Sequence, residues 1–408
     1  MELNKLIDGM KEDIIKSTQE IIKIKSVESE PKPGMPFGEG VAKSLECALG
    51  VAKRLGLHTV NVDGYVGYAE YGTGDDYVLA LGHLDIVPEG DGWIYPPYGA
   101  EIHDGKMYGR GTTDDKGPIM ATLFGLKAIK DAKLPVSKRI RVLFGTNEET
   151  GSKELDHYLE KEKPPVAGFT PDADYPIING EKGITIFDIV KDFNNINKGE
   201  NVIKYIKGGQ VSNMVPDYCE AGIISTNANV IVKLLRNFIK DTDYKLSAVV
   251  NTNLIIIKSI GEAAHGSTPE FGKNAIMQLL QFLGTINLDS NDGTELIKFL
   301  NENIGTETHG ESFGVCLEDE ISGKLSFNVG VINMDNNSAT VTLNLRYPVT
   351  MKLEDMMTPF NEKIKGTGLR VEKFVHQKPL YFPPDSPIIK TLQKVYTEQT
   401  GEKATLVS

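Results

Sequence analysis

The sequence predicts an α/β protein whose first domain is a sheet flanked by helices, interrupted by an inserted α+β domain. Apolar segments typical of strands alternate with amphipathic segments typical of helices over residues 1–183, which indicates a sheet covered by helices. The pattern then changes to a second set of strands and helices, and after two consecutive prolines a last helix is expected to return to the first domain. We therefore expect three segments, residues 1–183, 184–377 and 378–408, of which the first and third form one domain.

The elements of the first domain follow from the spacing of its apolar residues. Leu6, Met10 and Ile14 begin a series at helical spacing, and the prolines at positions 31, 33 and 36 interrupt it. In chain order we expect helices at residues 3–24, 39–55, 116–130, 154–162 and 388–400, and strands at residues 59–62, 65–71, 77–81, 139–144 and 168–170.

The insert is expected to have two similar-sized halves, although its sequence contains no repeat that proves a duplication. Its predicted strands are residues 185–191, 254–259, 325–331, 340–345 and 369–375, and its predicted helices are residues 229–241, 275–284, 295–303 and 353–364.

The composition is that of a soluble globular protein with room for two domains. The 408 residues are 40% hydrophobic and 25% charged, and the net charge of −12 argues against nucleic-acid binding through a general positive field. The chain starts with a charged helical segment, and no apolar run reaches the length of a membrane span. The three cysteines are far apart and form no Cys-x-x-Cys pair, so we expect no disulfide framework and a cytoplasmic location.

His83 and Asp85 directly follow the apolar strand of residues 77–81. On an extended backbone two side chains separated by one residue leave the same face. The carboxyl end of such a strand is where open α/β sheets carry their chemistry. There an imidazole can bind a metal while the nearby carboxylate orients it. Alone this pattern is weak evidence for a catalytic site.

Three further carboxylate clusters are predicted near strand ends of the same domain. Asp114 and Asp115 follow a Gly-Arg-Gly turn into a helix, Glu148 and Glu149 follow the strand of residues 139–144, and Asp172 follows the strand of residues 168–170. A helix N-cap explains one of the two aspartates but not both. Adjacent glutamates on a helix usually face solvent, but at a strand end one can bind metal while the other acts as a base.

Together the four clusters predict a carboxylate-rich metal centre, with enough ligands for two divalent ions that share a carboxylate and a water. Zinc, manganese or cobalt would suit one or two imidazoles among carboxylates.

The motifs that carry these residues resemble the co-catalytic metallopeptidase family of aminoacylase, carboxypeptidase G and succinyl-diaminopimelate desuccinylase. The resemblance covers nearly the whole chain and is closest to the bacterial dipeptidase V (PepV) branch. It rests on these segments: His83-Leu84-Asp85, Gly90-Asp91-Gly92-Trp93, Gly109-Arg110-Gly111-Thr112-Thr113-Asp114-Asp115-Lys116-Gly117-Pro118, Asn147-Glu148-Glu149-Thr150 and residues 171–183. The resemblance implies a zinc-peptidase-like catalytic domain with a mixed sheet, and it makes the insert a lid domain.

The resemblance also implies a role for each site residue. His83 and Asp172 would hold one metal, Glu149 would hold the second, and Asp114 would bridge both. Asp114 is preferred over Asp115 because it occupies the sixth place of the Gly-Arg-Gly motif, and the peptide bond after it is expected to be cis. The remaining two roles are catalytic: Asp85 would orient His83, and Glu148 would be the general base.

In the lid, three residues stand in segments that resemble the substrate-binding motifs of the family. His265 lies in a loop of small residues, so a satisfied core histidine is the weaker reading for it. By resemblance, Asn213 and His265 would contact the substrate and polarise its carbonyl group. Arg346 would hold the substrate carboxylate in a bidentate geometry.

The sequence therefore predicts a dipeptidase, active as a monomer, that uses a metal-bridged hydroxide and two divalent metal ions, with zinc first and manganese or cobalt as alternatives. One alternative is an N-acyl-amino-acid deacylase of the same family. Another is a catalytically incomplete metal-binding relative, because the family's last metal-ligand histidine is expected beyond Ser408.

Overall fold

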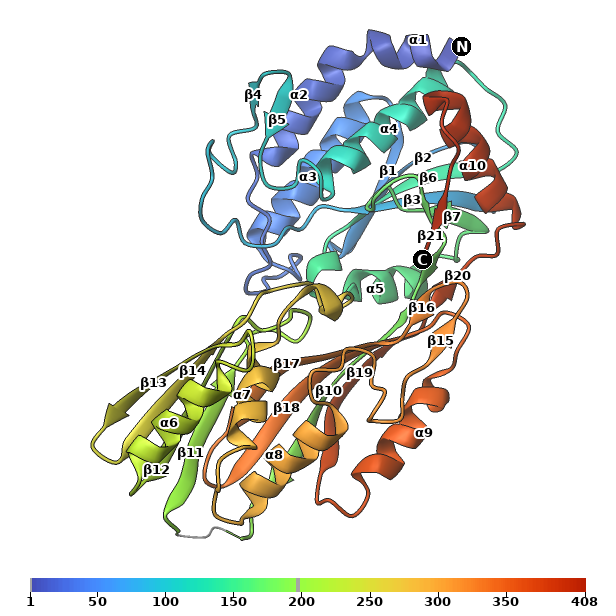
Figure 1. The fold of residues 1–408 in the computed structure, drawn as a ribbon. Coiled ribbons are helices and arrows are strands. Elements are labelled where there is room, and N and C mark those ends of the chain that lie inside the picture. The colour runs from blue at the N-terminus through green and yellow to red at the C-terminus, as the bar shows by residue number, and fades with distance from the viewer. Residues whose placement is uncertain (1, 196–198) are drawn as a thin grey trace. The chain divides into compact units, whose positions relative to one another are not determined.

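The computed structural model describes residues 2–195 and 199–408. Contacts between Cα atoms divide the chain into two compact units, Met1–Tyr175 and Pro176–Ser408, which are described separately (Figure 1). Residues 378–408 make their pairings within the second unit, and the proposed domain boundaries at residues 183 and 377 stay predictions.

Unit 1 contains a mixed sheet of five strands in the order β1-β2-β6-β3-β7. β3 pairs in parallel with β6 and β7, whereas β2 pairs antiparallel with β1 and β6. The carboxyl ends of β3 and β6 therefore meet at one edge of the sheet. The strands are β1 (His58–Val62), β2 (Val66–Tyr71), β3 (Tyr77–His83), β6 (Arg139–Gly145) and β7 (Ala167–Phe169).

Helices cover both faces of this sheet because successive side chains of its strands point to opposite sides. Ala80 and Val142 pack with apolar residues of α3 and α4, while Leu143 packs with Tyr158 of α5 on the other face. The helices are α1 (Glu2–Gly9), α2 (Lys11–Ile22), α3 (Glu39–Arg54), α4 (Lys116–Asp131) and α5 (Lys153–Lys161).

Two features of unit 1 differ from the predicted elements. The helix predicted at residues 3–24 is two helices, because α1 ends at Gly9, a residue that favours helix termination. A short hairpin of β4 (Glu101–His103) and β5 (Lys106–Tyr108) was not predicted. Asp104 and Gly105 both have positive φ angles in its turn, and Asp-Gly is a favoured pair for such turns.

Unit 2 is built around an antiparallel sheet of eight strands in the order β13-β14-β12-β11-β17-β18-β10-β19. It consists of two four-stranded halves, which three residue pairs between β11 and β17 join, and β13 and β19 are its edge strands. The strands are β10 (Gly183–Asp192), β11 (Asn201–Gly208), β12 (Tyr218–Ser225), β13 (Lys245–Asn251), β14 (Leu254–Ile260), β17 (Ser326–Met334), β18 (Ser338–Tyr347) and β19 (Arg370–Gln377).

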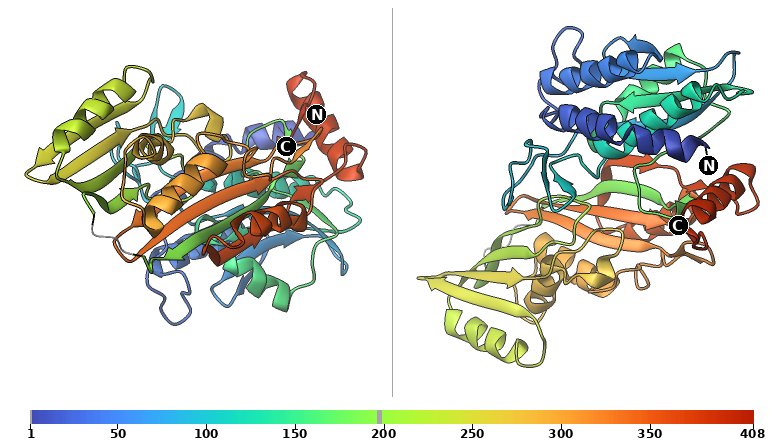
Figure 2. Two further views of the ribbon diagram at one scale, coloured as in Figure 1. Left: turned by 60° about the horizontal axis from the view of Figure 1, so that its bottom comes forward. Right: turned by 90° about the horizontal axis from the view of Figure 1, so that it is seen from above.

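Four helices cover one face of this sheet, and each contributes buried apolar residues to a single core (Figures 1 and 2). They are α6 (Ala228–Phe238), α7 (Ala275–Leu283), α8 (Asp292–Asn303) and α9 (Leu353–Ile364). The two halves of the predicted insert are therefore present, but β11, β12 and β13 were missing from the predicted strands.

The last helix of unit 2, α10 (Pro387–Thr400), packs through Ile389 against Ile177 and Ala404. The remaining elements are short: η1 (Glu148–Thr150), β8 (Ile177–Ile178), β9 (Gly180–Glu181), η2 (Pro269–Phe271), β15 (Glu318–Asp319), β16 (Gly323–Lys324), β20 (Leu380–Tyr381) and β21 (Leu406–Val407).

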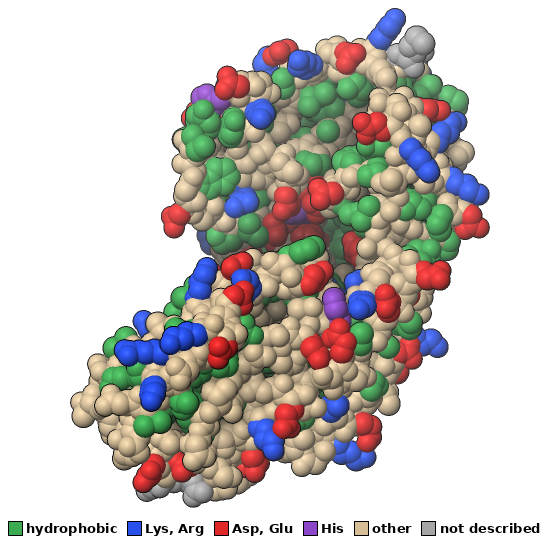
Figure 3. Space-filling view, in the orientation of Figure 1, with side chains coloured by type: hydrophobic (Ala, Val, Ile, Leu, Met, Phe, Trp, Pro, Cys, Tyr) green, Lys and Arg blue, Asp and Glu red, His purple; other side chains and the backbone are tan. Residues whose placement is uncertain are grey.

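Acidic and basic side chains are interspersed over the face of the molecule shown in Figure 3. Among the described residues, no helix is both long and apolar enough to cross a membrane.

Candidate metal centre

The last residue of β3, His83, is the centre of the predicted site. The residue is 2% exposed, and its Nδ1 atom lies 3.0 Å from the backbone oxygen of Asp85. Because a carbonyl oxygen only accepts hydrogen bonds, this contact places the proton of a neutral imidazole on Nδ1. The lone pair of Nε2 is then free to bind a metal.

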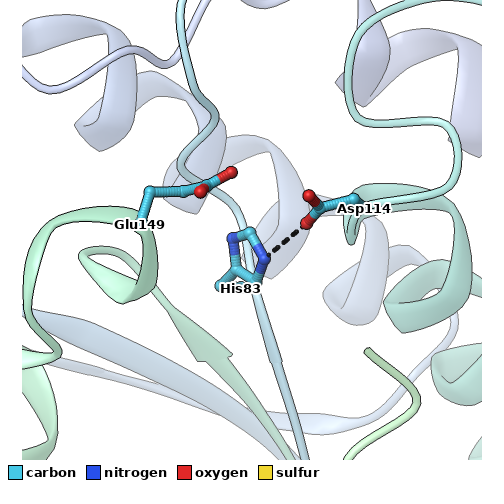
Figure 4. A group of neighbouring side chains, drawn as sticks. All are labelled: His83, Asp114 and Glu149. Carbon is cyan, nitrogen blue, oxygen red and sulfur yellow. Dashed lines mark hydrogen bonds and ion pairs between the residues drawn. The ribbon is translucent and has the colours of Figure 1, made fainter. Parts of the chain in front are cut away.

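Carboxylates from two other segments converge on Nε2 of His83. Asp114 Oδ1 lies 2.9 Å away and Asp172 Oδ2 lies 3.3 Å away. In Figure 4 the side chains of His83, Asp114 and Glu149 point toward one another. One ligand atom from each of these three residues lies within 4.8 Å of the others, and the same holds for His83, Asp115 and Asp172. The four predicted ligands are therefore brought together in unit 1.

Asp114 and Asp115 lie in the turn that leads into α4, and the peptide bond between them is cis, as expected. Asp115 is fully buried, and its Oδ2 accepts the backbone N–H of His83 at 3.0 Å. Its other oxygen has no hydrogen-bond partner among the described residues. Asp114 was preferred over Asp115 by resemblance to the family, but Asp115 is a second candidate ligand at the same site.

Asp85 connects the strand end to the two glutamates. Its side chain is 1% exposed, and its two carboxylate oxygens accept the backbone N–H groups of Glu148 at 3.2 Å and Glu149 at 3.1 Å. The carboxylate of Asp85 also lies 3.4 Å from Nδ1 of His83. One buried carboxylate therefore fixes both the imidazole and the start of η1. This arrangement agrees with an orienting role for Asp85.

The crowding of carboxylates shifts the proton affinities of the site. Burial and the charge of Asp114 raise the pKa of Glu149 to about 7. Burial and the charge of Asp172 raise the pKa of Asp115 to about 7. Burial also raises the pKa of Glu148. For His83, burial lowers the pKa, but hydrogen bonds to Asp114, Asp172 and Asp85 outweigh it and raise the pKa overall.

These residues fit divalent cations. Oxygen ligands and one imidazole suit zinc, manganese or cobalt. A cation would offset both the burial of the carboxylates, which is the main cause of their raised pKa values, and their mutual repulsion, and it would give the Asp115 oxygen that lacks a hydrogen-bond partner a positive charge nearby. The sequence-predicted ligand set therefore agrees with the local chemistry.

The three predicted substrate-binding residues lie in unit 2. Asn213 is in the loop after β11 and His265 is in the loop after β14, and the N–H of Gly266 donates to the carbonyl oxygen of Asn213 at 2.7 Å. Arg346 is on β18, and its positive charge adds to burial in lowering the pKa of His265.

Sequence reasoning missed two residues that support these groups. Glu154 on α5 is 1% exposed and carries an unpartnered carboxylate oxygen, and burial raises its pKa to about 7. Ser267 lies beside His265 in the loop after β14. A buried glutamate in a helix and a serine in a small-residue loop give no periodic signal, so the sequence alone offered little to identify them.

Comparisons with known proteins find a matching family and similar relatives. The model of the family described as Peptidase family M20/M25/M40 matches residues 79–408. A Bacillus subtilis protein named "Putative dipeptidase YtjP" is 39% identical over 402 residues, covering 98% of this chain and 86% of the relative. A Staphylococcus epidermidis protein named "Putative dipeptidase" is 35% identical over 396 residues, covering 95% of this chain and 84% of the relative.

Solved structures share the fold at lower identity. Human carnosine dipeptidase 1 aligns with a TM-score of 0.58 at 16% identity, over 100% of this chain and 87% of that chain. A metallo-carboxypeptidase of the M20 family from Sulfolobus solfataricus aligns with a TM-score of 0.56 at 18% identity, over 97% of this chain and 85% of that chain.

Proposed function

The chain belongs to peptidase family M20/M25/M40 and is a metallopeptidase, and from this premise we propose that it hydrolyses dipeptides with the help of two divalent cations. The observation that carries the proposal is the convergence of Asp114 and Asp172 on Nε2 of His83, with Glu149 in one group with His83 and Asp114. The names of the relatives support a dipeptide as substrate.

The proposed ligand sets follow the contacts in unit 1. His83 and Asp172 would hold the first cation, Glu149 the second, and Asp114 would bridge them. In support, Asp114 and Asp172 both lie within 3.3 Å of Nε2 of His83, and Glu149 belongs to the group formed by His83 and Asp114. Zinc is the first candidate, and manganese and cobalt are the alternatives.

The cations would supply Lewis acidity, which lowers the pKa of the attacking water and polarises the substrate carbonyl. Glu148 would take the proton from that water and pass it to the leaving amine. Burial raises the pKa of Glu148 above its ordinary value, and this shift brings a carboxylate closer to the neutral range in which a general base works. Asp85 would keep His83 and the η1 turn in position through the hydrogen bonds described above.

In unit 2, Asn213 and His265 would bind the substrate near its scissile carbonyl and Arg346 would bind its free carboxylate. The resemblance of their segments to lid motifs supports these roles, and so does the pairing of the Asn213 and His265 loops. Activity as a monomer and a cytoplasmic location stay predictions.

The test is a metal-dependence assay on the purified full-length protein. We expect a chelator to abolish the release of amino acids from dipeptides, and added zinc or manganese to restore it. N-acetyl-amino acids should be poor substrates, because the function proposed here is not deacylation. Faster cleavage of N-acetyl-amino acids than of dipeptides would favour the deacylase alternative, and full dipeptidase activity in a protein shown by elemental analysis to be metal-free would refute the proposal.

A further inference from the structure

The hydroxyl and the backbone N–H of Ser267 both contact Nδ1 of His265. The Ser267 hydroxyl lies 2.6 Å from Nδ1 of His265, and the Ser267 backbone N–H donates to that atom at 3.4 Å. A backbone N–H never accepts a hydrogen bond, so the nitrogen that receives it carries a lone pair. The Ser267 hydroxyl can either donate or accept a hydrogen bond, so it then donates to Nδ1 as well. In a neutral imidazole the proton is therefore on Nε2.

The environment keeps this imidazole neutral. Burial lowers the pKa of His265 from its ordinary value, and the charge of Arg346 on β18 lowers it further. A neutral ring with Nδ1 occupied as an acceptor is a hydrogen-bond donor at Nε2. This is the opposite of His83, whose Nδ1 faces a carbonyl oxygen and whose Nε2 is left as a lone pair. At Nε2, His265 therefore offers a hydrogen-bond donor, whereas His83 offers a lone pair.

A contact with strand β17 fixes the position of Ser267. Its carbonyl oxygen accepts the hydroxyl of Ser326 on β17 at 2.6 Å, and the Ser326 side chain is buried. The same loop is tied to the Asn213 loop by the N–H of Gly266 and by the bridge between Met214 and His265. These contacts use backbone atoms of residues 265–267, so they would persist if the Ser267 hydroxyl were removed.

We propose that Ser267 is a positioning residue that fixes His265 as the neutral, Nε2-protonated tautomer, so that this ring donates a hydrogen bond to the substrate carbonyl oxygen as negative charge develops on it. The proposal rests on the proposed function. With the proton on Nδ1 instead, Nε2 would direct a lone pair at that oxygen and repel it. Stabilisation of a developing oxyanion depends on donors that are already oriented before the reaction.

The first test reads the tautomer directly, without an activity measurement. In protein labelled with ¹⁵N histidine, two-bond proton–nitrogen correlation spectra distinguish a protonated ring nitrogen from a bare one, and a His265→Gln variant identifies the His265 signals. We expect Nε2 protonated and Nδ1 bare in the wild type, and a mixture of both tautomers in Ser267→Ala. A wild-type His265 that is protonated on Nδ1 would overturn the proposal.

The second test is kinetic. Loss of a complete oxyanion donor costs about 10²–10³-fold in kcat. Ser267→Ala keeps the ring and loses only its orientation, so we expect a decrease of about tenfold in kcat with a smaller change in KM. Ser267→Thr keeps the hydroxyl and should restore most of the activity. Ser247→Ala, on an exposed position of the edge strand β13, is the matched control and should equal the wild type.

The two proposals fail in different ways. Wild-type kcat in Ser267→Ala, or equal losses in the Ala and Thr variants, would overturn the role of Ser267 while dipeptide hydrolysis by the wild type still stands. A metal-loaded wild type that cleaves no dipeptide would instead refute the proposed function and, with it, the catalytic purpose of Ser267.

Discussion

Glu148 and Glu149 are neighbours in the chain, and we propose different roles for them. Glu149 belongs to the candidate metal group with His83 and Asp114, and a Glu148 oxygen lies 3.9 Å from Nε2 of His83. Asp85 holds the backbone N–H of each, so removal of either side chain leaves the turn anchored. The two roles are therefore separable by mutation.

We expect Glu148→Ala to lower kcat by about 10²–10⁴-fold while the protein still binds two metal ions, because a general base contributes that much. Glu149→Ala should lose one ion as well as activity. Elemental analysis of both variants after dialysis, together with steady-state kinetics, checks this division. Equal metal loss in the two variants would contradict it.

Glu154 shows how a buried carboxyl group affects stability. Its pKa is raised from 4.5 to about 7 by burial. Between these two values the folded state binds more protons than the unfolded state, so the free energy of unfolding falls as pH rises through this window and levels off above it. The neutral form of Glu154 is the one that the fold favours.

A Glu154→Gln variant removes this titration with little change of shape. Relative to the wild type in metal-free buffer, the variant should gain up to about 3 kcal/mol in unfolding free energy between about pH 5 and about pH 8. Urea denaturation at both pH values measures the difference. Parallel stability profiles for the two proteins would show that Glu154 is ionised in the fold.

At the scale of elements, β17 supports the loops that contain Asn213 and His265. Ser326, Asn328 and Gly330 alternate along it and so share a face. Asn328 donates to the carbonyl oxygens of Ser212 at 2.9 Å and Met214 at 2.8 Å, which flank the predicted substrate residue. At Gly330, where the pairing with β18 shifts register, an added Cβ would lie 2.5 Å from the oxygen of Ser212.

Replacing Asn328 with Asp would leave these two carbonyl oxygens without donors and would bury a carboxylate against them. We expect a loss of about 3 kcal/mol in unfolding free energy, and a lower kcat/KM in any preparation that remains folded. Urea denaturation and dipeptide kinetics provide the measurements. Asn337→Asp, at an exposed turn position, is the control for the charge change, and equal behaviour of the two variants would refute the supporting role.

Elements with strong local patterns were predictable from the sequence, and those fixed by pairing were not. The helix predicted at residues 39–55 is α3, and the strand predicted at residues 139–144 is β6, because their apolar spacing alone decides their faces. The strands β11, β12 and β13 were missed. Two of them pair with strands that are distant in the chain, β11 with β17 and β12 with β14, and no local pattern encodes such pairing.

For the candidate site, the sequence indicated which residues would meet but not how they would be oriented. The clusters that contain His83, Asp114, Glu149 and Asp172 were indicated because carboxylates follow strand ends, and the choice of these four ligands came from the family resemblance. The tautomers of His83 and His265 depend instead on single contacts with Asp85 and Ser267, and no spacing rule encodes such contacts.

For the whole molecule, the location of the candidate metal ligands in one unit has a thermodynamic consequence. All candidate metal ligands lie within Met1–Tyr175, so metal binding should stabilise unit 1 by linkage. At a free metal concentration of 100 times Kd, one site contributes about 2.7 kcal/mol. Hydrogen-exchange mass spectrometry should then show about 100-fold slower exchange in globally protected peptides from β3, α4 and β6. Peptides from β12 and β14 should be unchanged, and equal protection of both units would contradict this assignment.

The two edges of the eight-stranded sheet differ in what they offer to another polypeptide. β19 also exposes two apolar side chains, Phe374 and Val375, but Arg370, Glu372 and Lys373 precede them, and such charged side chains discourage a foreign strand from adding to the sheet. β13 ends in Val249 and Val250, which are 52% and 42% exposed beside unpaired backbone groups. At high concentration, or during expression in a crowded cell, β13 is therefore the place where intermolecular sheet growth would begin, and a lysine at position 249 would be the simplest way to keep the protein in solution.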